Sequence, residues 1–398
     1  MKFLLKREKY SSILYKEKFY DTGEELDLEF SDVFRLSRLN SVIAKYDFVP
    51  YDPLLWKNQK FINFYGDIDL QSGFGNVSYY LLKESSNTLQ IAYTGRTYGV
   101  NNRVIFSSQN RPLNQAGAMI WHDQPRERWL ESPFEKNIAI VPWETTQIPN
   151  SWVHRINSLD VLLTCCNQNI QAFRDSGITV PIELIHWAID PERFYPLERL
   201  ESKTFTFGTM GALSYRKGTE LLVEAFQEEF PRERDVKLIC KTSYNTYSYD
   251  VKNKRIEVQI TPVTPEELLS GFFQKIDCFV FPTRGEGFGL PALEAMATGV
   301  PVIVTNWSGP CEYMNKDVGW LIDYKMVPAK KFSEQVYKEY CGDWAEPNKQ
   351  HLRQLMRYAY SHRDEVKQKG QVAAEYARQN WLWKDKIKMF HQALNSHL

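Results

Sequence analysis

Short apolar runs rich in β-forming residues alternate with helix-forming stretches along this chain, and the alternation occurs twice. Such alternation is typical of βαβ units, in which helices cover a parallel sheet. The two blocks flank a segment near residues 181–202 that is rich in proline and charge. The sequence therefore predicts an α/β protein with two Rossmann-like units. The first block contains KFINFYG, NVSYYLLKE, TLQIAYTG, AGAMIWH, NIAIVPW, SLDVLLTCC and NQNIQAFRDSG, and the second contains TFTFGTMG, GTELLVEAFQEEF, DVKLICKTS, RIEVQI, TPEELLSGFFQ, DCFVFPT, PALEAMATG and PVIVTN.

The expected domain boundaries follow from these two blocks. With 398 residues, the chain is long enough for two or three domains, each with its own core. We expect an N-terminal Rossmann-like domain at 1–190, a C-terminal one at 191–370, and a C-terminal helix at 371–398, where apolar positions recur at three and four residues. The first sixty residues mix charged and aromatic residues without clean periodicity, so they predict no more than a helix or peripheral strands.

The charge balance excludes a strong electrostatic field over the whole molecule. The chain has 49 basic and 49 acidic residues, so it would attract neither nucleic acid nor an anionic membrane over long range, and any anionic ligand must be bound locally. The apolar stretch near the N-terminus is too short for a signal-peptide core, and no later run has membrane-spanning length. We expect a soluble, cytoplasmic protein without a transmembrane segment, and leave peripheral membrane contact open.

The six cysteines show neither zinc spacing nor disulfide spacing. Four lie in or beside apolar runs that resemble buried strands, which predicts reduced thiols in the core. Cys165 and Cys166 are adjacent, and neighbours on a strand point to opposite faces, so we expect no redox pair there. The cysteines stand at positions 165, 166, 240, 278, 311 and 341.

The segment RGEGFGLPALEAMATGVPVIVTN, residues 284–306, carries the most informative pattern. The run before it, CFVFPT, predicts a buried strand, and PALEAMATG predicts a helix with Pro291 at its first position and Gly299 at its exit. The glycines between them occupy the strand-to-helix turn. Free N–H groups and the positive end of a helix favour an anion at such a turn, so phosphate or sugar hydroxyls suit this place.

Two glutamates bracket this turn. Glu286 is expected in the loop and Glu294 about one turn inside the helix, so both can face one ligand. Carboxylates repel phosphate but accept hydrogen bonds from neutral hydroxyls, and a nucleotide sugar offers both kinds of group. The alternative for each residue is a solvated turn position for Glu286 and an exposed helix charge for Glu294.

The spacing of Glu286 and Glu294, with GFGLPAL between them and TGVPVIVTNWSGPCEYM downstream, resembles the E-x7-E motif of retaining GT-B glycosyltransferases, especially glycosyltransferase family 4, the glycosyl transferases group 1. The resemblance covers about residues 60 to 398 and implies a GT-B fold with two Rossmann-like domains that face each other across a cleft. By this resemblance, Glu286 contacts hydroxyls of the transferred sugar and Glu294 grips the ribose. The backbone that would hold sugar and diphosphate belongs to Gly287, Phe288, Gly289 and Leu290.

A second block, FTFGTMGALSYRKGTELLVEAF, resembles the strand, loop and helix that carry a basic pair for the donor diphosphate in this family. Lys217 falls on the expected lysine. The expected arginine would stand directly after Gly211, where this chain has Ala212. The alternatives are that Arg216 substitutes from a shifted position or that one positive contact is absent.

In the first half, GDIDLQSGFGNVSYYLLKE resembles the N-terminal glycine loop of the family. Gly73, Phe74 and Gly75 would let the backbone approach the donor phosphate or the acceptor. The family often places a histidine at the end of a strand, and here VPWETTQIPNSW puts Glu144 in that place, with His122 in MIWHDQP as the rival. A carboxylate there would either bind a hydroxyl of acceptor or sugar, or form a structural ion pair.

The remaining expectations also rest on the resemblance. LIHWAIDPERFYP resembles the interdomain segment, and WLWKDKIKMF the C-terminal helix, which implies that residues 371–398 return to the first domain. The implied reaction is a retaining, metal-independent hexosyl transfer from a GDP- or UDP-hexose to a carbohydrate or other hydroxyl acceptor, with no cofactor and with GDP-mannose favoured over UDP-glucose. A donor phosphate oxygen would take the proton of the acceptor.

Three alternatives stay open. Gly287, Gly289 and Ala292 satisfy the G-x-G-x-x-A pattern of a dinucleotide-binding oxidoreductase, although the next strand ends at Asn306 without the acidic residue such a site needs. Asp67 and Asp69 form a D-x-D pattern that could hold a divalent cation in a metal-dependent GT-A transferase. A sugar-binding or scaffolding protein with the same fold and no turnover is the non-enzymatic alternative.

Overall fold

The chain is described here from a computed structural model, which divides into two compact units. Unit 1 comprises Met1–Asp123, Glu131–Ala139 and Leu398, and unit 2 comprises Gln124–Leu130 and Ile140–His397. The residues that the structure describes are 2–6, 12–15, 18–21, 25–27, 47–50, 61–70, 72–86, 88–98, 102, 105, 108–109, 117–199, 202–242, 253–260 and 265–398.

The described part of the first sixty residues is built from strands. Strands β1 (Lys2–Lys6), β4 (Glu25–Asp27) and β5 (Asp47–Pro50) form an antiparallel sheet in the order β4-β1-β5. Strands β2 (Ser12–Tyr15) and β3 (Lys18–Asp21) pair as an antiparallel hairpin. Of the two expectations for this segment, the peripheral strands are confirmed for the described residues.

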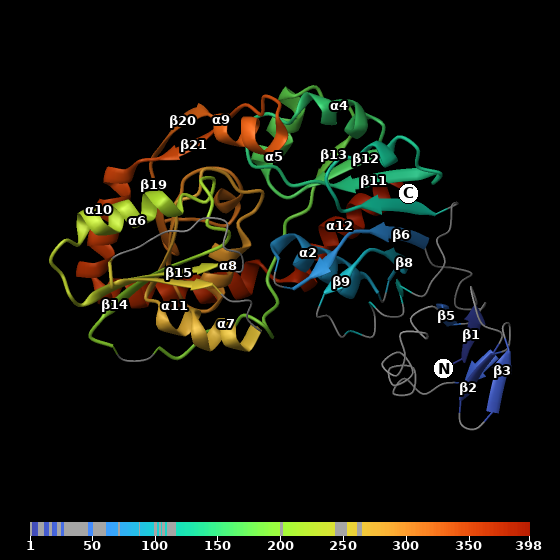
Figure 1. Ribbon diagram of the computed structural model, residues 1–398, viewed down its shortest axis with the longest axis horizontal. Coiled ribbons are helices and arrows are strands. Elements are labelled where there is room, and N and C mark those ends of the chain that lie inside the picture. The colour runs from blue at the N-terminus through green and yellow to red at the C-terminus, as the bar shows by residue number, and fades with distance from the viewer. Residues whose placement is uncertain are drawn as a thin grey trace. The chain divides into compact units, whose positions relative to one another are not determined.

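Unit 1 then contains the parallel sheet that the first sequence block predicts (Figure 1). Its strands run in the order β11-β10-β6-β8, with bounds β6 (Phe61–Tyr65), β8 (Gln90–Thr94), β10 (Ala118–Trp121) and β11 (Lys136–Ile140). Helix α2 (Gly73–Ser85) connects β6 to β8 and begins where Ser72 accepts a hydrogen bond from the N–H of Gly75. The short strands β7 (Ile68–Asp69) and β9 (Thr97–Tyr98) pair beside it.

Unit 2 begins with the rest of the first block. Strands β12 (Val161–Thr164) and β13 (Ile182–Leu184) are parallel, and helices α4 (Asn150–Asn157) and α5 (Asn167–Asp175) precede and follow β12. The chain at Val141 runs beside β12, because its N–H donates to the carbonyl of Leu163. A short 3-10 turn, η2 (Glu127–Trp129), lies upstream.

The second sequence block forms a six-stranded parallel sheet in the order β16-β15-β14-β17-β18-β19. Its strands are β14 (Phe205–Met210), β15 (Val236–Thr242), β16 (Ile256–Ile260), β17 (Cys278–Phe281), β18 (Val302–Thr305) and β19 (Gly319–Ile322). Numbered along the chain, this is the 3-2-1-4-5-6 order of a Rossmann sheet. The direction in which strands are added reverses between β14 and β17, so the loops after these two strands meet where such sheets bind ligands.

Helices cover both faces of this sheet (Figure 1). On one face α6 (Thr219–Glu229) packs on α10 (Lys349–Ser361), and on the other α8 (Leu290–Ala297) packs on α11 (Arg363–Asn380), with α7 (Pro265–Gly271) beside them. The central strands β17 and β18 are almost entirely apolar because both of their faces are buried, whereas the edge strand β16 is polar at two positions and partly exposed. The core between the sheet, α6 and α10 includes Phe207, Leu222, Phe226, Leu352 and Met356.

The C-terminal stretch is helical as predicted, but it forms two helices. Helix α11 ends at Asn380, and α12 (Trp383–His397) begins after Leu382, which forms a parallel bridge with Ile189. The carbonyl of Trp381 accepts from the N–H of Ile189. This bridge holds the break in place, because the chain there pairs with the segment near residue 189 instead of continuing its helical hydrogen bonds.

One excursion was not expected from the sequence. Between β19 and α10 the chain forms strand β20 (Tyr324–Pro328), the short helical turns α9 (Lys330–Phe332) and η5 (Ser333–Tyr337), and strand β21 (Asp343–Pro347). Strands β20 and β21 pair antiparallel. Two further short turns, η3 (Phe273–Lys275) and η4 (Gly309–Glu312), precede β17 and follow β18. In the described part of the chain, every helix is too short or too polar to span a bilayer.

Candidate functional site

The loops that follow β14 and β17 bring three predicted site residues together in unit 2. The Nζ atom of Lys217 lies 2.7 Å from Oε1 of Glu286, and NH1 of Arg216 lies 2.9 Å from the same oxygen. Arg216 also donates to the carbonyl of Gly285 at 2.5 Å, and the hydroxyl of Thr283 donates to Glu286 at 3.0 Å. Two cations thus converge on one carboxylate at the reversal point of the sheet. Arg216 therefore reaches this cluster from its shifted place in the sequence.

Burial and charge oppose each other at this cluster. Only 6% of Glu286 is exposed. Burial alone would raise the pKa of its carboxyl group, but Lys217 and Arg216 outweigh burial and hold the pKa below its usual value. Burial lowers the pKa of Lys217, and Glu286 opposes that effect. Glu286 is therefore a buried, ionised acid, and the alternative of a solvated turn residue is wrong.

Glu144 lies at the edge of the same cluster. Its Oε1 atom is 3.8 Å from NH2 of Arg216, and its side chain is 23% exposed. Burial raises the pKa of this carboxyl group, and Arg216 opposes the rise. The backbone of Glu144 also packs on residues 284–289, the glycine-rich bend between β17 and α8. A Cβ atom at Gly285 would collide with the carbonyl oxygen of Glu144. Glu144 is thus a weakly paired carboxylate beside Arg216.

Helix α8 begins at the end of this bend. Gly289 is its N-cap, with a φ of 85° in the left-handed region that glycine adopts without strain. The helix begins at Leu290, so Pro291 occupies its second position, whereas the sequence predicted the first. Gly299 follows the end of the helix with a φ of 82°. Within the part of the chain that the structure describes, the N–H groups of residues 287–289 donate no hydrogen bond. They remain available to an anion or a hydroxyl.

The side chain of Phe288 is buried among aromatic rings. It is 1% exposed, and its ring lies 5.5 Å from that of Tyr313 and 5.8 Å from that of Trp381. The hydroxyl of Tyr313 donates to the carbonyl of Gly289 at 2.7 Å. Aromatic packing around Phe288 and the Tyr313 hydrogen bond therefore fix the conformation of the bend.

Glu294 lies inside α8, as predicted, but it has a different environment from Glu286. It is 7% exposed, and its carboxylate makes no hydrogen bond or ion pair with any described residue. Burial raises its pKa to about 7, and Arg193 opposes the rise. The alternative of an exposed helix charge is wrong, because this acid is buried.

The predicted residues of unit 1 also lie together. The ring of Phe74 stacks on the imidazole of His122 with centroids 3.8 Å apart, and Nδ1 of His122 is 2.7 Å from the hydroxyl of Ser78. Gly73 and Gly75 form the first turn of α2. Burial lowers the pKa of His122 to about 3, so the imidazole is neutral at pH 7. His122 and the glycine loop thus form one group, whereas Glu144 belongs to the cluster in unit 2.

The structure gives no support to the alternatives of a metal-dependent transferase and a dinucleotide-binding oxidoreductase. The carboxylate of Asp67 forms an ion pair with Arg96 at 2.7 Å. This ion pair accounts for the charge of Asp67 without a metal ion shared with Asp69. The described residues contain no group of three or more His, Cys, Asp or Glu side chains that could hold a metal ion. The strand after α8 is β18, and no acid ends it, so the dinucleotide reading gains no support.

The cysteines are free, and all but Cys311 are buried. The expectation of core thiols, which rested on four cysteines in apolar runs, is therefore confirmed. The expected opposite orientation of Cys165 and Cys166 is also wrong. Both thiols reach the side-chain oxygen of Asn169, at 3.6 and 2.9 Å, because β12 ends before them and Cys166 is the N-cap of α5.

Sequence reasoning missed Arg284, the residue at the start of the bend. Its side chain is 3% exposed and contacts Glu220 and Glu346 at 2.6 Å each. The available signal was its position: a charged residue that follows a buried strand inside an otherwise apolar and glycine-rich stretch needs partners within the fold.

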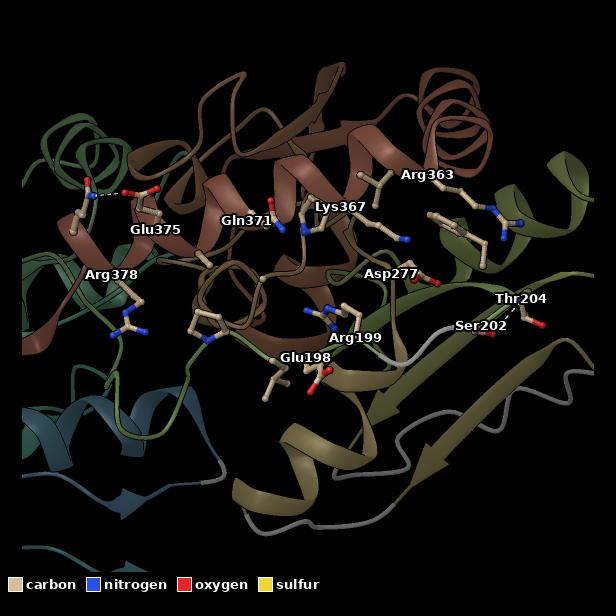
Figure 2. A pocket seen from close by; sticks show the side chains of 18 residues that line it. Glu198, Arg199, Ser202, Thr204, Asp277, Arg363, Lys367, Gln371, Glu375 and Arg378 are labelled. Atoms are coloured by element: carbon tan, nitrogen blue, oxygen red, sulfur yellow. Dashed lines mark hydrogen bonds between the residues drawn. The ribbon is translucent and has the colours of Figure 1, made fainter.

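A separate cavity of about 830 Å³ lies at the amino-terminal edge of the second sheet, beside α11 (Figure 2). Arg199 and Arg363 point toward it, but both are engaged by the protein. Arg199 donates to the carbonyl of Thr298 at 2.7 Å, and Arg363 pairs with Asp235 at 2.8 Å. No predicted site residue lines this cavity, so it is distinct from the cluster at Glu286.

Comparison with solved structures identifies the fold as GT-B. The chain aligns with sucrose-phosphate synthase from Thermosynechococcus elongatus with a TM-score of 0.62 and 13% identity, covering 85% of this chain and 99% of the other. It aligns with HepE from Anabaena in complex with UDP and glucose with a TM-score of 0.62 and 12% identity, covering 85% and 100%. At these identities the likeness shows the fold alone, and the predicted GT-B class is confirmed.

Sequence comparisons refine this class. Residues 195–354 match the family model "Glycosyl transferases group 1". The chain is 30% identical over 146 residues to a lipopolysaccharide core biosynthesis mannosyltransferase of Rhizobium meliloti, covering 32% of this chain and 42% of the relative. It is 25% identical over 197 residues to a GDP-mannose-dependent alpha-mannosyltransferase of Corynebacterium glutamicum, covering 46% and 44%. The chain spans less than half the length of these curated relatives.

Proposed function

We propose that this chain is a glycosyltransferase that moves a hexose from a nucleotide sugar to a hydroxyl group of a carbohydrate or other acceptor. The observation that carries the proposal is the convergence of Lys217 and Arg216 on Glu286 at the reversal point of the second sheet. Free N–H groups of the bend adjoin this cluster. Cations, amide donors and a carboxylate together match the diphosphate and the hydroxyls of a nucleotide sugar.

In the proposed reaction, the bond between the anomeric carbon and the donor diphosphate breaks, and a bond from that carbon to the acceptor oxygen forms. The diphosphate leaves with the bonding electron pair, so negative charge develops on its oxygen. Lys217, Arg216 and the amide groups at the start of α8 stabilise that charge, which lowers the barrier. Before the donor binds, Glu286 pairs with both cations and offsets one of their two charges. With the donor present, it accepts hydrogen bonds from sugar hydroxyls.

Further details are part of the proposal. We assign donor binding mainly to residues 191–370, with Glu294 at the ribose, and acceptor binding mainly to residues 1–190, including Glu144 or His122. We propose retention of configuration, with a donor phosphate oxygen taking the acceptor proton, and no requirement for a metal. The relatives named as mannosyltransferases favour GDP-mannose as the donor. A fold neighbour bound to UDP and glucose keeps UDP-glucose as the second candidate.

The test is a panel of nucleotide sugars, each added to the protein in a thermal-unfolding measurement and then in a transfer assay. A ligand that binds only the native state raises its stability, by about 2.7 kcal/mol at one hundred times its Kd. We expect GDP-mannose to give the largest shift. A panel in which no nucleotide sugar raises the stability would contradict the proposal. Binding without hydrolysis or transfer would favour the sugar-binding or scaffolding alternative.

A further inference from the structure

Arg284 lies in a loop, yet its guanidinium contacts two carboxylates and an aromatic ring. Its Nε and NH2 atoms donate to the two carboxylate oxygens of Glu346 at 2.6 and 2.8 Å. Its NH1 atom donates to Glu220 at 2.6 Å, and its guanidinium lies 3.6 Å from the ring centre of Tyr215. A guanidinium held by a forked carboxylate, a second acid and an aromatic face has one orientation.

Arg284 also holds the backbone of the loop that follows β14 and carries Arg216 and Lys217, which we call the basic loop. The N–H group of Arg284 donates to the carbonyl of Arg216 at 2.7 Å, and its NH1 atom donates to the carbonyl of Tyr215. These two carbonyls immediately precede Lys217. Side chain and main chain of Arg284 therefore fix the turn from which both cations reach Glu286.

This turn needs an anchor because of where its arginine stands. The resemblance to the family placed an arginine directly after Gly211, but this chain has Ala212 there. The cation comes instead from Arg216, inside a tight turn in which the N–H of Lys217 donates to Ser214 and that of Gly218 to Tyr215. A small rotation of this turn would move Arg216 and Lys217 away from Glu286 together.

The anchor extends to the excursion between β20 and β21. Glu346 belongs to β21, and the N–H of Ala345 on the same strand donates to the carbonyl of Arg284 at 3.0 Å. The ring of Trp344 lies 5.7 Å from that of Tyr215. Through Arg284, the excursion that the sequence did not predict therefore contacts the basic loop.

We infer that Arg284 is a positioning residue, which uses Glu346 and Glu220 to hold the Tyr215–Lys217 turn so that Arg216 and Lys217 meet at Glu286. The inference rests on the proposed function for its kinetic consequence, but its structural consequence is independent of it. The competing explanation is that Arg284 contributes to stability alone, as any buried ion pair can.

Arg357 provides a matched control. It donates to Glu229 at 2.7 Å and Glu233 at 2.8 Å, to the carbonyl of Glu229, and stacks 4.5 Å from the ring centre of Phe230. It therefore contacts two acids and one carbonyl, as Arg284 does, and lies over two aromatic rings where Arg284 lies over one. Its contacts join α10 to α6 and the residues after it, and do not involve the basic loop. Its side chain is more exposed, at 35% against 3%.

The first experiment compares Arg284→Lys with Arg357→Lys by hydrogen exchange of the peptide that covers residues 212–218. Lysine keeps the charge but cannot bridge both acids. We expect exchange in this peptide to rise about tenfold in Arg284→Lys and to stay as in the unaltered protein in Arg357→Lys. Glu346→Gln, which keeps the arginine and weakens only its fork, should give a smaller rise and serves if Arg284→Lys does not fold.

The second experiment measures turnover with the donor that the panel identifies and binding of inorganic pyrophosphate as a probe. Misplaced groups cost on the order of a hundredfold in rate, so we expect kcat to fall between about tenfold and a hundredfold in Arg284→Lys, with pyrophosphate affinity reduced. In a Lys217→Gln background, Arg284→Lys should reduce kcat less than it does alone, because only its effect on Arg216 remains. Arg357→Lys should keep kcat within about twofold of the unaltered protein.

The outcomes separate the two proposals. If the loop becomes labile in Arg284→Lys but no nucleotide sugar binds the unaltered protein, the positioning role stands and the proposed function falls. If the donor is turned over but Arg284→Lys matches Arg357→Lys in exchange and in kcat, the positioning role is wrong and the proposed function stands.

Discussion

Glu286 and Glu294 are the same residue type, eight positions apart and almost equally buried, yet their surroundings differ completely. Glu286 is 6% exposed and contacts two cations within 3 Å. Glu294 is 7% exposed, and its nearest favourable charge is Arg193, which forms no ion pair with it within the described residues. The pKa of Glu286 lies below its usual value, whereas burial raises that of Glu294 to about 7.

This difference shows that burial alone does not decide the charge of an acid. Desolvation acts in the same direction on both carboxyl groups, and the neighbouring cations decide the outcome at Glu286. One glutamate is therefore charged across the physiological range, and the other changes its charge within it.

The largest effect should come from Glu286→Gln. Removing this charge leaves Lys217 without its ion pair and Arg216 with only the 3.8 Å contact to Glu144, which costs about 3 kcal/mol of unfolding free energy. Turnover should fall about a hundredfold or more, since a group that orients sugar and cations is lost. Nucleotide diphosphate affinity should be kept or increased, because the cations no longer share their charge with an acid. Calorimetry and steady-state kinetics on the same preparations measure these effects.

A paired variant sharpens this prediction. In Glu286→Gln with Lys217→Met, one excess cation is gone, so part of the lost stability should return even though turnover stays low. Losses that add without coupling would show that Glu286 and Lys217 act separately, and would contradict the cluster as described.

Glu294→Gln should have a smaller effect, which depends on pH. The folded protein binds a proton at Glu294 up to a pKa of about 7, whereas the unfolded chain loses it near 4.5. Ionisation of Glu294 therefore lowers stability as pH rises from about 4.5 to 7, and the full cost is present above pH 7. Relative to the unaltered protein, the variant should gain about 3 kcal/mol of unfolding free energy between pH 4 and pH 8. Urea unfolding at several pH values measures this difference.

The same titration should affect donor binding. If ribose hydroxyls donate to the ionised carboxylate, affinity for the nucleotide sugar should rise between pH 6 and pH 8 in the unaltered protein and stay flat in Glu294→Gln. A parallel pH dependence in both proteins would remove Glu294 from the ribose site.

The smallest effect should come from Arg193→Gln. Arg193 lowers the pKa of Glu294, so Arg193→Gln should raise that pKa and extend the loss of stability to higher pH. At pH 8 the unfolding free energy should fall by less than about 1 kcal/mol. Turnover at saturating donor should be unchanged. Arg232→Gln, at an exposed position after α6, is the control. Equal pH profiles in the two variants would show that Arg193 does not moderate Glu294.

The sequence predicted the features that depend on neighbours along the chain. The buried strand at 278–281, the glycine turn and the helix that follows were read from apolar runs and from Gly289, Pro291 and Gly299. Their order fixed Glu286 in the loop and Glu294 in the helix. The helix start was misplaced by one residue, because proline is accepted at either of the first two positions of a helix.

The features that the sequence did not predict depend on residues far apart in the chain. Arg284 and Glu346 are separated by sixty-two positions, and no local pattern pairs them. The break between α11 and α12 arises from pairing with Ile189, and Cys165 and Cys166 turn together because β12 ends one residue before them. In each case a tertiary contact overrode the local pattern.

The buried ring of Phe288 has a consequence for how such a chain can change its substrate. Because that side chain packs against Tyr313 and Trp381, only the peptide groups of the bend are left to contact a ligand there. Under the proposed function, substitutions within residues 287–289 would therefore disturb the conformation of the bend more than they would alter the choice of sugar. Changes in sugar preference would then come from residues that surround the bend.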